Sequence, residues 1–115
     1  MLTIYHNPRC SKSRQTLALI EENKQEVTIV EYLKTPLNKA TIEQLLALLS
    51  LSPRAMMRTK ESEYSEQNLA TADDATLIAA MVTTPKLIER PIVSDGRNAI
   101  IGRPPENVLS LINKK

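Results

Sequence analysis

The sequence predicts an α/β fold, in which a mixed sheet is flanked by helices and a helical insertion occupies the middle of the chain. Three observations predict it. Short strand-like segments rich in aliphatic and β-branched residues lie near both ends, a helix-length segment separates the first two, and the central part carries helix-capping signals. A chain of 115 residues suits one domain, and 42% hydrophobic residues can form a core, although Trp and Phe are absent.

The N-terminal part predicts a strand–helix–strand unit. Residues 2–5 (LTIY) are typical of a short strand, and Asn7-Pro8 is a turn signal. A helix is expected over about residues 11–23, and the segment 27–33 (VTIVEYL) predicts a second strand. Strands joined in this way pair in parallel, so we expect Cys10 at the sheet edge where α/β proteins bind ligands.

The middle of the chain predicts helices. Residues 41–44 (TIEQ) form a capping box before an apolar run, and Ser52-Pro53 supplies an N-cap followed by proline before RAMMR. Residues 71–74 begin a further amphipathic stretch, which Thr84-Pro85 is expected to end.

The C-terminal part predicts a hairpin and a last helix. Residues 90–93 and 98–101 are expected to be strands joined by an Asp-Gly turn. Gly102 is expected to end the second strand, and Pro104 or Pro105 to begin the helix. The helix residues expected to face the core are Val108, Leu109 and Ile112.

This order of elements leaves a thioredoxin-like core once the central helices are removed. We therefore expect a single domain over residues 1–115, with the core formed by about 1–35 and 86–115 and the insertion by about 36–85.

Composition excludes several classes of protein. A net charge of +2, from 15 basic and 13 acidic residues, gives no argument for nucleic-acid binding, and three Tyr are too few for a base-stacking platform. No apolar run approaches the roughly 18 residues that span a membrane, and no signal peptide is visible. One cysteine suits a reducing compartment, and no Cys/His cluster suggests a metal. We expect a cytoplasmic monomer without a bound metal or cofactor.

The surroundings of Cys10 favour a reactive thiolate. A helix that begins directly after it would direct N–H groups and the positive end of the helix dipole at the sulfur. Arg9, Lys12 and Arg14 add positive charge, and His6 would add more if protonated. The same features favour an oxyanion next to the thiolate. The alternatives are that Cys10 is an inert buried thiol and that His6 only forms a hydrogen bond in the turn.

A second thiol is missing from this segment. Ser13 occupies the position that would complete a C-x-x-C motif. A mixed species on Cys10 must therefore be resolved by a small thiol or by another protein.

Four ordered segments resemble the glutaredoxin-coupled arsenate reductases, especially their short members. They are IYHNPRCSKSRQTL (4–17), RAMMRTKE (54–61), LIERPIV (87–93) and IGRPPENVL (101–109). The chain departs from well-studied members at Arg9, where they carry a small residue, and it lacks their C-terminal extension.

The resemblance implies a role for each matching residue. Cys10 is the nucleophile, and the oxyanion is bound by three arginines, whose guanidinium groups stay charged and offer paired donors. These arginines are Arg58, Arg90 and Arg103. The supporting residues are His6, which helps to keep the thiol ionised, Ser13, Arg14 and Pro91, which follows a cis peptide bond.

The resemblance also implies a reaction that confers arsenical resistance. The Cys10 thiolate attacks arsenate, glutathione attacks the adduct as co-substrate, and glutaredoxin reduces the mixed species so that arsenite leaves. One alternative is a glutathione-dependent reductase of another substrate. Another is a redox-related regulator that binds RNA polymerase, whose usual C-x-x-C switch Ser13 removes.

Overall fold

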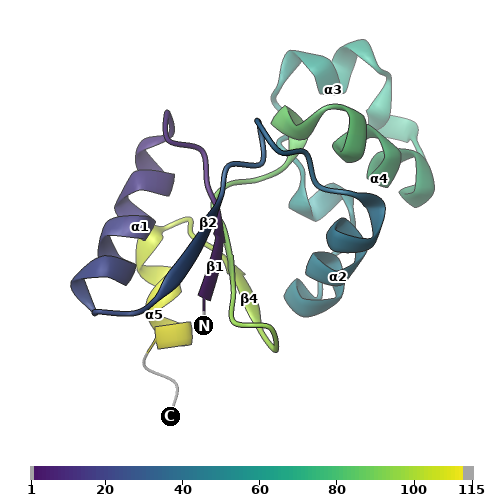
Figure 1. The fold of residues 1–115 in the computed structure, drawn as a ribbon. Coiled ribbons are helices and arrows are strands. Elements are labelled where there is room, and N and C mark those ends of the chain that lie inside the picture. The colour runs from purple at the N-terminus through teal and green to yellow at the C-terminus, as the bar shows by residue number, and fades with distance from the viewer. Residues whose placement is uncertain (1, 113–115) are drawn as a thin grey trace. The chain divides into compact units, whose positions relative to one another are not determined.

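The computed structural model describes residues 2–112 of the chain (Figure 1). The described residues fold as two compact units, one formed by residues 2–35 and 90–112 and the other by residues 36–89. The second unit ends at residue 89 because the bridge between Met57 and Ile88 belongs to it. The predicted α/β class with a mixed sheet is confirmed.

The first unit contains a four-stranded sheet with the order β2-β1-β3-β4. As predicted, β1 (Leu2–Tyr5) pairs in parallel with β2 (Val27–Val30). On its other side β1 pairs antiparallel with β3 (Ile92–Ser94), which forms the predicted hairpin with β4 (Ala99–Ile101). The carboxyl end of β1 therefore lies between two neighbouring strands, which fixes the start of the loop that follows it.

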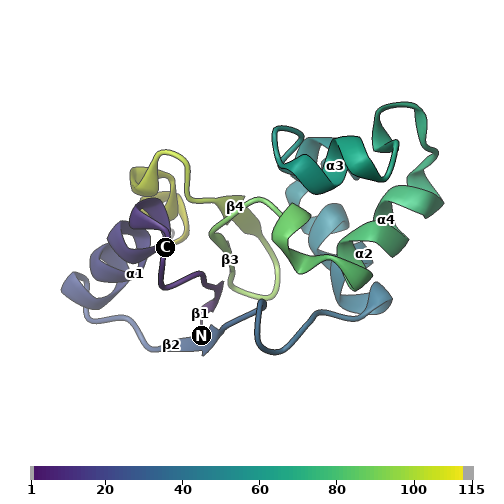
Figure 2. The same ribbon diagram turned by 90° about the horizontal axis from the view of Figure 1, so that it is seen from above.

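Two helices pack together on one face of this sheet, as both views show (Figures 1 and 2). They are α1 (Ser11–Glu22) and α5 (Leu109–Ile112), the latter continuing from the 3-10 turn Pro105–Val108. A cluster of buried aliphatic side chains lies between these helices and the sheet. Full burial of one aliphatic side chain contributes about 1.5–3 kcal/mol, so the cluster anchors α1 to the sheet. Its buried members are Leu2, Ile4, Ile20, Val93, Val108 and Leu111.

Two predictions for the first unit are wrong in detail. The second strand ends at Val30 and not at residue 33, because the backbone N–H groups of Lys34 and Thr35 both donate to the Glu31 carbonyl at 2.9 Å and form a turn. In the last helix Leu111 is buried, whereas Leu109 is only half-buried. The 3-10 helix Pro105–Val108 that precedes α5 has three residues per turn, so the buried face differs from the one expected for a continuous α-helix.

The second unit is helical, with α2 (Lys39–Leu49), α3 (Ser62–Glu66) and α4 (Asp74–Thr83). Single 3-10 turns lie between α2 and α3 at Arg54–Met56, between α3 and α4 at Leu69–Thr71, and after α4 at Pro85–Leu87. The helix α4 ends before Thr84-Pro85 as predicted, since the residue before a proline is pushed out of helical conformation.

Two helix starts predicted for this unit are wrong. The N-cap of α2 is Asn38, whose Oδ1 accepts from the Thr41 backbone N–H at 2.8 Å, so the helix begins before the capping box at residues 41–44. The segment RAMMR forms one 3-10 turn and then extends, because Met57 bridges to Ile88. The short helix α3 was not predicted.

No helix among residues 2–112 is long and apolar enough to cross a membrane.

Candidate functional site

Cys10 caps the N-terminus of α1 in the first unit. The chain leaves β1 at Tyr5 and turns through residues 6–9, and the Cys10 N–H donates to the Asn7 carbonyl at 3.0 Å. Cys10 has extended backbone angles (φ −94, ψ 124), and its carbonyl accepts the first helical hydrogen bond, from Arg14 N–H. Its side chain therefore lies at the end of the helix where N–H groups lack partners within the helix.

Opposing influences act on the Cys10 thiol, which is 9% exposed. Burial is the largest of them and raises its pKa, because it disfavours the charged form. The backbone N–H of Ser13, the charge and a hydrogen bond of Arg90, and the backbone N–H of Lys12 act in the other direction. Together they outweigh burial, so the pKa of Cys10 lies below its ordinary value and the thiolate forms more readily than in an unperturbed cysteine.

Arg90 brings a cation to this thiol from the other end of the sequence. It precedes Pro91, and the peptide bond between them is cis. The Nε and Nη1 atoms of Arg90 are buried and have no hydrogen-bond partner within residues 2–112. Buried donors of a charged group are costly when unpaired, so they suit an anion held beside the Cys10 sulfur.

His6 and Ser13 stabilise the loop that carries Cys10. Both side chains are buried, and His6 Nδ1 and Ser13 Oγ are 2.6 Å apart. The Ser13 hydroxyl also accepts from the Asn7 backbone N–H at 3.0 Å. The position three residues after the cysteine thus ties the start of α1 to the end of β1, while its backbone N–H faces the thiol.

His6 does not supply the positive charge that the sequence analysis considers. Burial lowers its pKa most, Glu31 raises it and Arg14 lowers it, and the net shift is downward. The lowered pKa favours the neutral imidazole at neutral pH, and its contact with the Ser13 hydroxyl links it to the loop that carries Cys10. Arg14 itself braces the loop, since its Nη1 donates to the Pro8 carbonyl at 2.9 Å.

Arg103 lies after Gly102, where two backbone segments approach each other. The Gly102 N–H donates to the Pro91 carbonyl at 2.8 Å. A Cβ at Gly102 would lie 2.5 Å from Thr16 Oγ1 and 2.8 Å from Pro91 Cγ, so only glycine fits here. This contact joins the backbone leading to Arg103 with α1 and with the segment that follows Arg90. The side chain of Arg103 is exposed.

Arg58 belongs to the second unit and is already ion-paired there. Its Nη1 contacts the Glu61 carboxylate, and its Nε lies 3.8 Å from Glu89 Oε1. The backbone supports this cluster, because Arg58 N–H donates to the Leu87 carbonyl at 2.7 Å. Glu61 follows Arg58 at a spacing of three residues, a local signal for this pair, whereas the sequence offers no such signal for Glu89.

The neighbouring arginine of RAMMR is structural. Arg54 donates from Nε to the Tyr64 hydroxyl at 3.0 Å and from Nη2 to the carbonyls of Leu69 and Ala72. It therefore holds α3 and the following turn in place.

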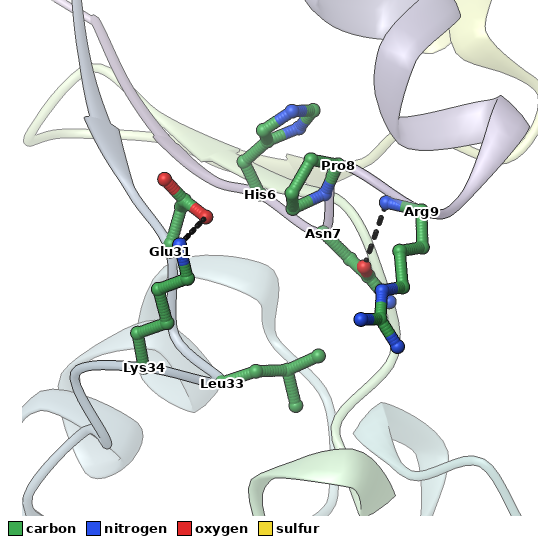
Figure 3. A pocket seen from close by; sticks show the side chains of 7 residues that line it. All are labelled: His6, Asn7, Pro8, Arg9, Glu31, Leu33 and Lys34. Carbon is green, nitrogen blue, oxygen red and sulfur yellow. Dashed lines mark hydrogen bonds and ion pairs between the residues drawn. The ribbon is translucent and has the colours of Figure 1, made fainter.

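Beside the loop of residues 6–9 the structure has a pocket of about 270 Å³ that the sequence did not reveal. The turn after β2 forms its other wall (Figure 3). Its lining residues are His6, Asn7, Pro8, Arg9, Glu31, Leu33 and Lys34. Within residues 2–112 no group of three His, Cys, Asp or Glu side chains could hold a metal ion.

A family model and related proteins match this chain over nearly its whole length. The ArsC family model matches residues 5–111. Uncharacterized protein YfgD of Escherichia coli K12 is 54% identical over 112 residues, covering 95% of this chain and 94% of that protein. The arsenate reductase of Haemophilus influenzae is 44% identical over 112 residues, covering 95% of this chain and 97% of that protein.

The solved structures agree with this match. The arsenate reductase from Vibrio cholerae superposes with a TM-score of 0.91 at 49% identity, and the match covers 95% of each chain. The YffB protein (PA3664) gives a TM-score of 0.84 at 16% identity and covers 97% of this chain and 99% of that one, which shows the same thioredoxin-like fold alone. The chain belongs to the ArsC family.

Proposed function

We propose that this protein reduces arsenate to arsenite through the Cys10 thiolate, with glutathione and glutaredoxin as reductants. The observation that carries the proposal is the unpaired, buried Nε and Nη1 of Arg90 next to a thiol whose pKa is lowered. A doubly charged oxyanion repels a thiolate unless a cation offsets its charge, and Arg90 supplies that cation. The ArsC match and the relatives named arsenate reductase support the choice of arsenic.

The first step joins sulfur to arsenic. The Cys10 thiolate attacks arsenic(V), an S–As bond forms, and an As–O bond breaks. The departing hydroxide takes up one proton and leaves as water. The N–H groups of Lys12 and Ser13 and the guanidinium of Arg90 stabilise negative charge at this point.

The next steps supply two electrons from two thiols. Glutathione displaces a second oxygen as water and forms its own S–As bond. A glutaredoxin thiolate then attacks the glutathione sulfur, a mixed disulfide leaves, and the electron pair of the broken S–As bond remains on arsenic, now arsenic(III). Water hydrolyses the last S–As bond, so arsenite departs and Cys10 returns as a thiol.

This order of reaction steps suits a site with one thiol. Ser13 stands where a second cysteine would resolve the adduct, and its hydroxyl is engaged by His6 and Asn7. Among residues 2–112 Cys10 is the one thiol present, so the second sulfur must come from outside the chain. We propose a cytoplasmic enzyme on this basis, since glutathione and glutaredoxin act in reducing compartments.

A coupled assay tests the proposal. Arsenate-dependent NADPH oxidation is measured with glutathione, glutaredoxin and glutathione reductase, for wild type, Cys10→Ser and Arg90→Ala. We expect turnover in wild type, loss in Cys10→Ser and a large decrease in Arg90→Ala. Wild type that is folded, with its thiol reduced, and no faster than the control without enzyme would refute it.

One observation favours a second candidate, a glutathione-dependent reductase of a less charged substrate. Arg58 is paired with Glu61 and Glu89, so its charge is offset before any substrate arrives. The same assay with a small disulfide in place of arsenate tests this candidate. Turnover with the disulfide and none with arsenate would favour it.

A further inference from the structure

The pocket between residues 6–9 and the turn after β2 joins a hydrophobic wall to charges of both signs. Leu33 is 43% exposed and Pro8 lies across from it. Arg9 and Lys34 are cationic, and Glu31 is anionic. Figure 3 shows these side chains arranged around one gap, with Glu31 and Lys34 on one side and Arg9 on the other.

The charges of this pocket are available to a ligand. The Arg9 backbone N–H donates to Asn7 Oδ1 at 3.0 Å, but within the described residues its guanidinium has no hydrogen-bond or ion-pair partner. Lys34 Nζ lies 3.5 Å from Glu31 Oε1, and the Lys34 side chain is 78% exposed. An exposed ion pair of this kind contributes little to the free energy of folding, so a ligand can replace it with a small loss of free energy.

The combination of a hydrophobic wall with charges of both signs favours a small zwitterionic ligand. A simple oxyanion would be repelled by Glu31, and a purely apolar molecule would leave three charges unused. A volume of about 270 Å³ lies near the lower end of the range for small-molecule sites, roughly 300–1,000 Å³. A short zwitterionic peptide has carboxylates for Arg9 and Lys34, an ammonium group for Glu31 and a methylene backbone for Leu33.

The pocket also adjoins the nucleophile. Pro8 and Arg9 line the pocket, and Cys10 follows them directly in the chain. The Cα atoms of Arg9 and Cys10 are therefore about 3.8 Å apart. Because Cys10 is the next residue of this loop and the N-cap of α1, a peptide seated in the pocket would lie against the same loop that carries the nucleophile.

We propose that this pocket binds the peptide part of glutathione, with Arg9 and Lys34 on its carboxylates and Glu31 on its ammonium group. The inference rests on the proposed function, because it assigns a place to the thiol co-substrate of that reaction. Arg9 then acts as a specificity residue for the co-substrate, separate from the oxyanion at Arg90.

Binding is measured first without any turnover. Amide chemical shifts are followed by NMR during titration with S-methylglutathione, which cannot attack arsenic. We expect saturable shifts concentrated at residues 6–9 and 31–34. The double variant Arg9→Gln/Lys34→Gln is expected to raise the Kd about tenfold, whereas Arg97→Gln, an exposed arginine of the hairpin turn, is expected to leave it unchanged.

A modified ligand tests the contact with Glu31. An N-acetylated S-methylglutathione, which has no ammonium group, is expected to bind wild type several-fold more weakly than the parent compound. In Glu31→Gln the two compounds are expected to bind alike. The inference would be overturned if the two compounds bound wild type with equal affinity or if S-methylglutathione gave no saturable shifts. It would also be overturned if these residues shifted on addition of glutaredoxin but not of S-methylglutathione.

The coupled assay separates this inference from the proposed function. Arsenate turnover with an unchanged KM for glutathione in Arg9→Gln/Lys34→Gln would refute the pocket and leave the arsenate reaction standing. Saturable binding at the pocket without arsenate turnover would refute the reaction and leave the pocket standing.

Discussion

The guanidinium of Arg90 lies beside the thiol of Cys10, although the two residues come from opposite ends of the sequence, and it lowers the pKa of that thiol by its charge and by a hydrogen bond. The sheet makes this possible, because β1 leads into the loop before Cys10 and pairs with β3, which begins just after Arg90. The antiparallel pairing places the end of one strand next to the start of the other.

Removal of the Arg90 charge is expected to make Cys10 less reactive. In Arg90→Gln the thiolate loses the cation that lowers its pKa, so alkylation by iodoacetamide at neutral pH should slow by roughly threefold to tenfold. The pH profile of alkylation should move to higher pH. Arg97→Gln makes the same change of charge on the exposed hairpin turn, and an equal effect there would contradict the account.

Loss of the Ser13 hydroxyl is expected to destabilise the protein. Ser13→Ala leaves the Asn7 N–H and His6 Nδ1 without their partner in a buried place, which costs about 1–3 kcal/mol. Urea unfolding measures the difference. Ser110→Ala, which removes an exposed hydroxyl, should change the free energy of unfolding by less than about 0.5 kcal/mol. Equal losses in the two variants would be inconsistent with a buried network.

A methyl group at position 102 is expected to disturb the packing of α1. In Gly102→Ala the new Cβ meets Thr16 and Pro91, and overpacking of this kind costs about 1–3 kcal/mol. Thr16→Ala removes the nearer neighbour, so the double variant should lose less stability than the sum of the two single variants. Simple additivity in unfolding experiments would show that the clash is relieved in another way.

The stability of the protein is expected to fall as the pH drops below the ordinary pKa of histidine. Burial lowers the pKa of His6 in the folded state, so the unfolded chain takes up the proton first. Stability from the neutral imidazole is therefore present above about pH 6.5 and is lost as the pH falls below that value.

The variant His6→Asn tests this dependence. Asn offers an acceptor near the position of Nδ1 but does not titrate. Unfolding free energies measured between about pH 7 and pH 5.5 should decline less steeply in His6→Asn than in wild type. Parallel declines would mean that another group is responsible.

Much of the fold could be predicted from local patterns. The strand at residues 2–5, the helix after Cys10 and the hairpin are each specified by neighbouring residues, and all three are present. The second strand was predicted too long because Glu31, whose carbonyl accepts two turn hydrogen bonds, lies in a segment that is otherwise typical of a strand.

The candidate site was less accessible to such reasoning. Cys10 was identified from its position and its basic neighbours, but the bond between His6 and Ser13 depends on how the loop folds back on the helix. The pairing of Arg58 with Glu89 requires the bridge between Met57 and Ile88, which brings distant segments together. The roles of Arg58, Arg90 and Arg103 in binding an oxyanion stay predictions.

The most direct test of the account is protection of Cys10 by arsenate against alkylation, because it needs neither glutathione nor the correct glutaredoxin. The account predicts that arsenate slows the reaction of Cys10 with iodoacetamide in a saturable way in wild type, and that Arg90→Gln loses most of this protection while Arg97→Gln keeps it. Alkylation of wild type at the same rate with and without arsenate would contradict the claim that Arg90 and the Cys10 thiolate form an oxyanion site.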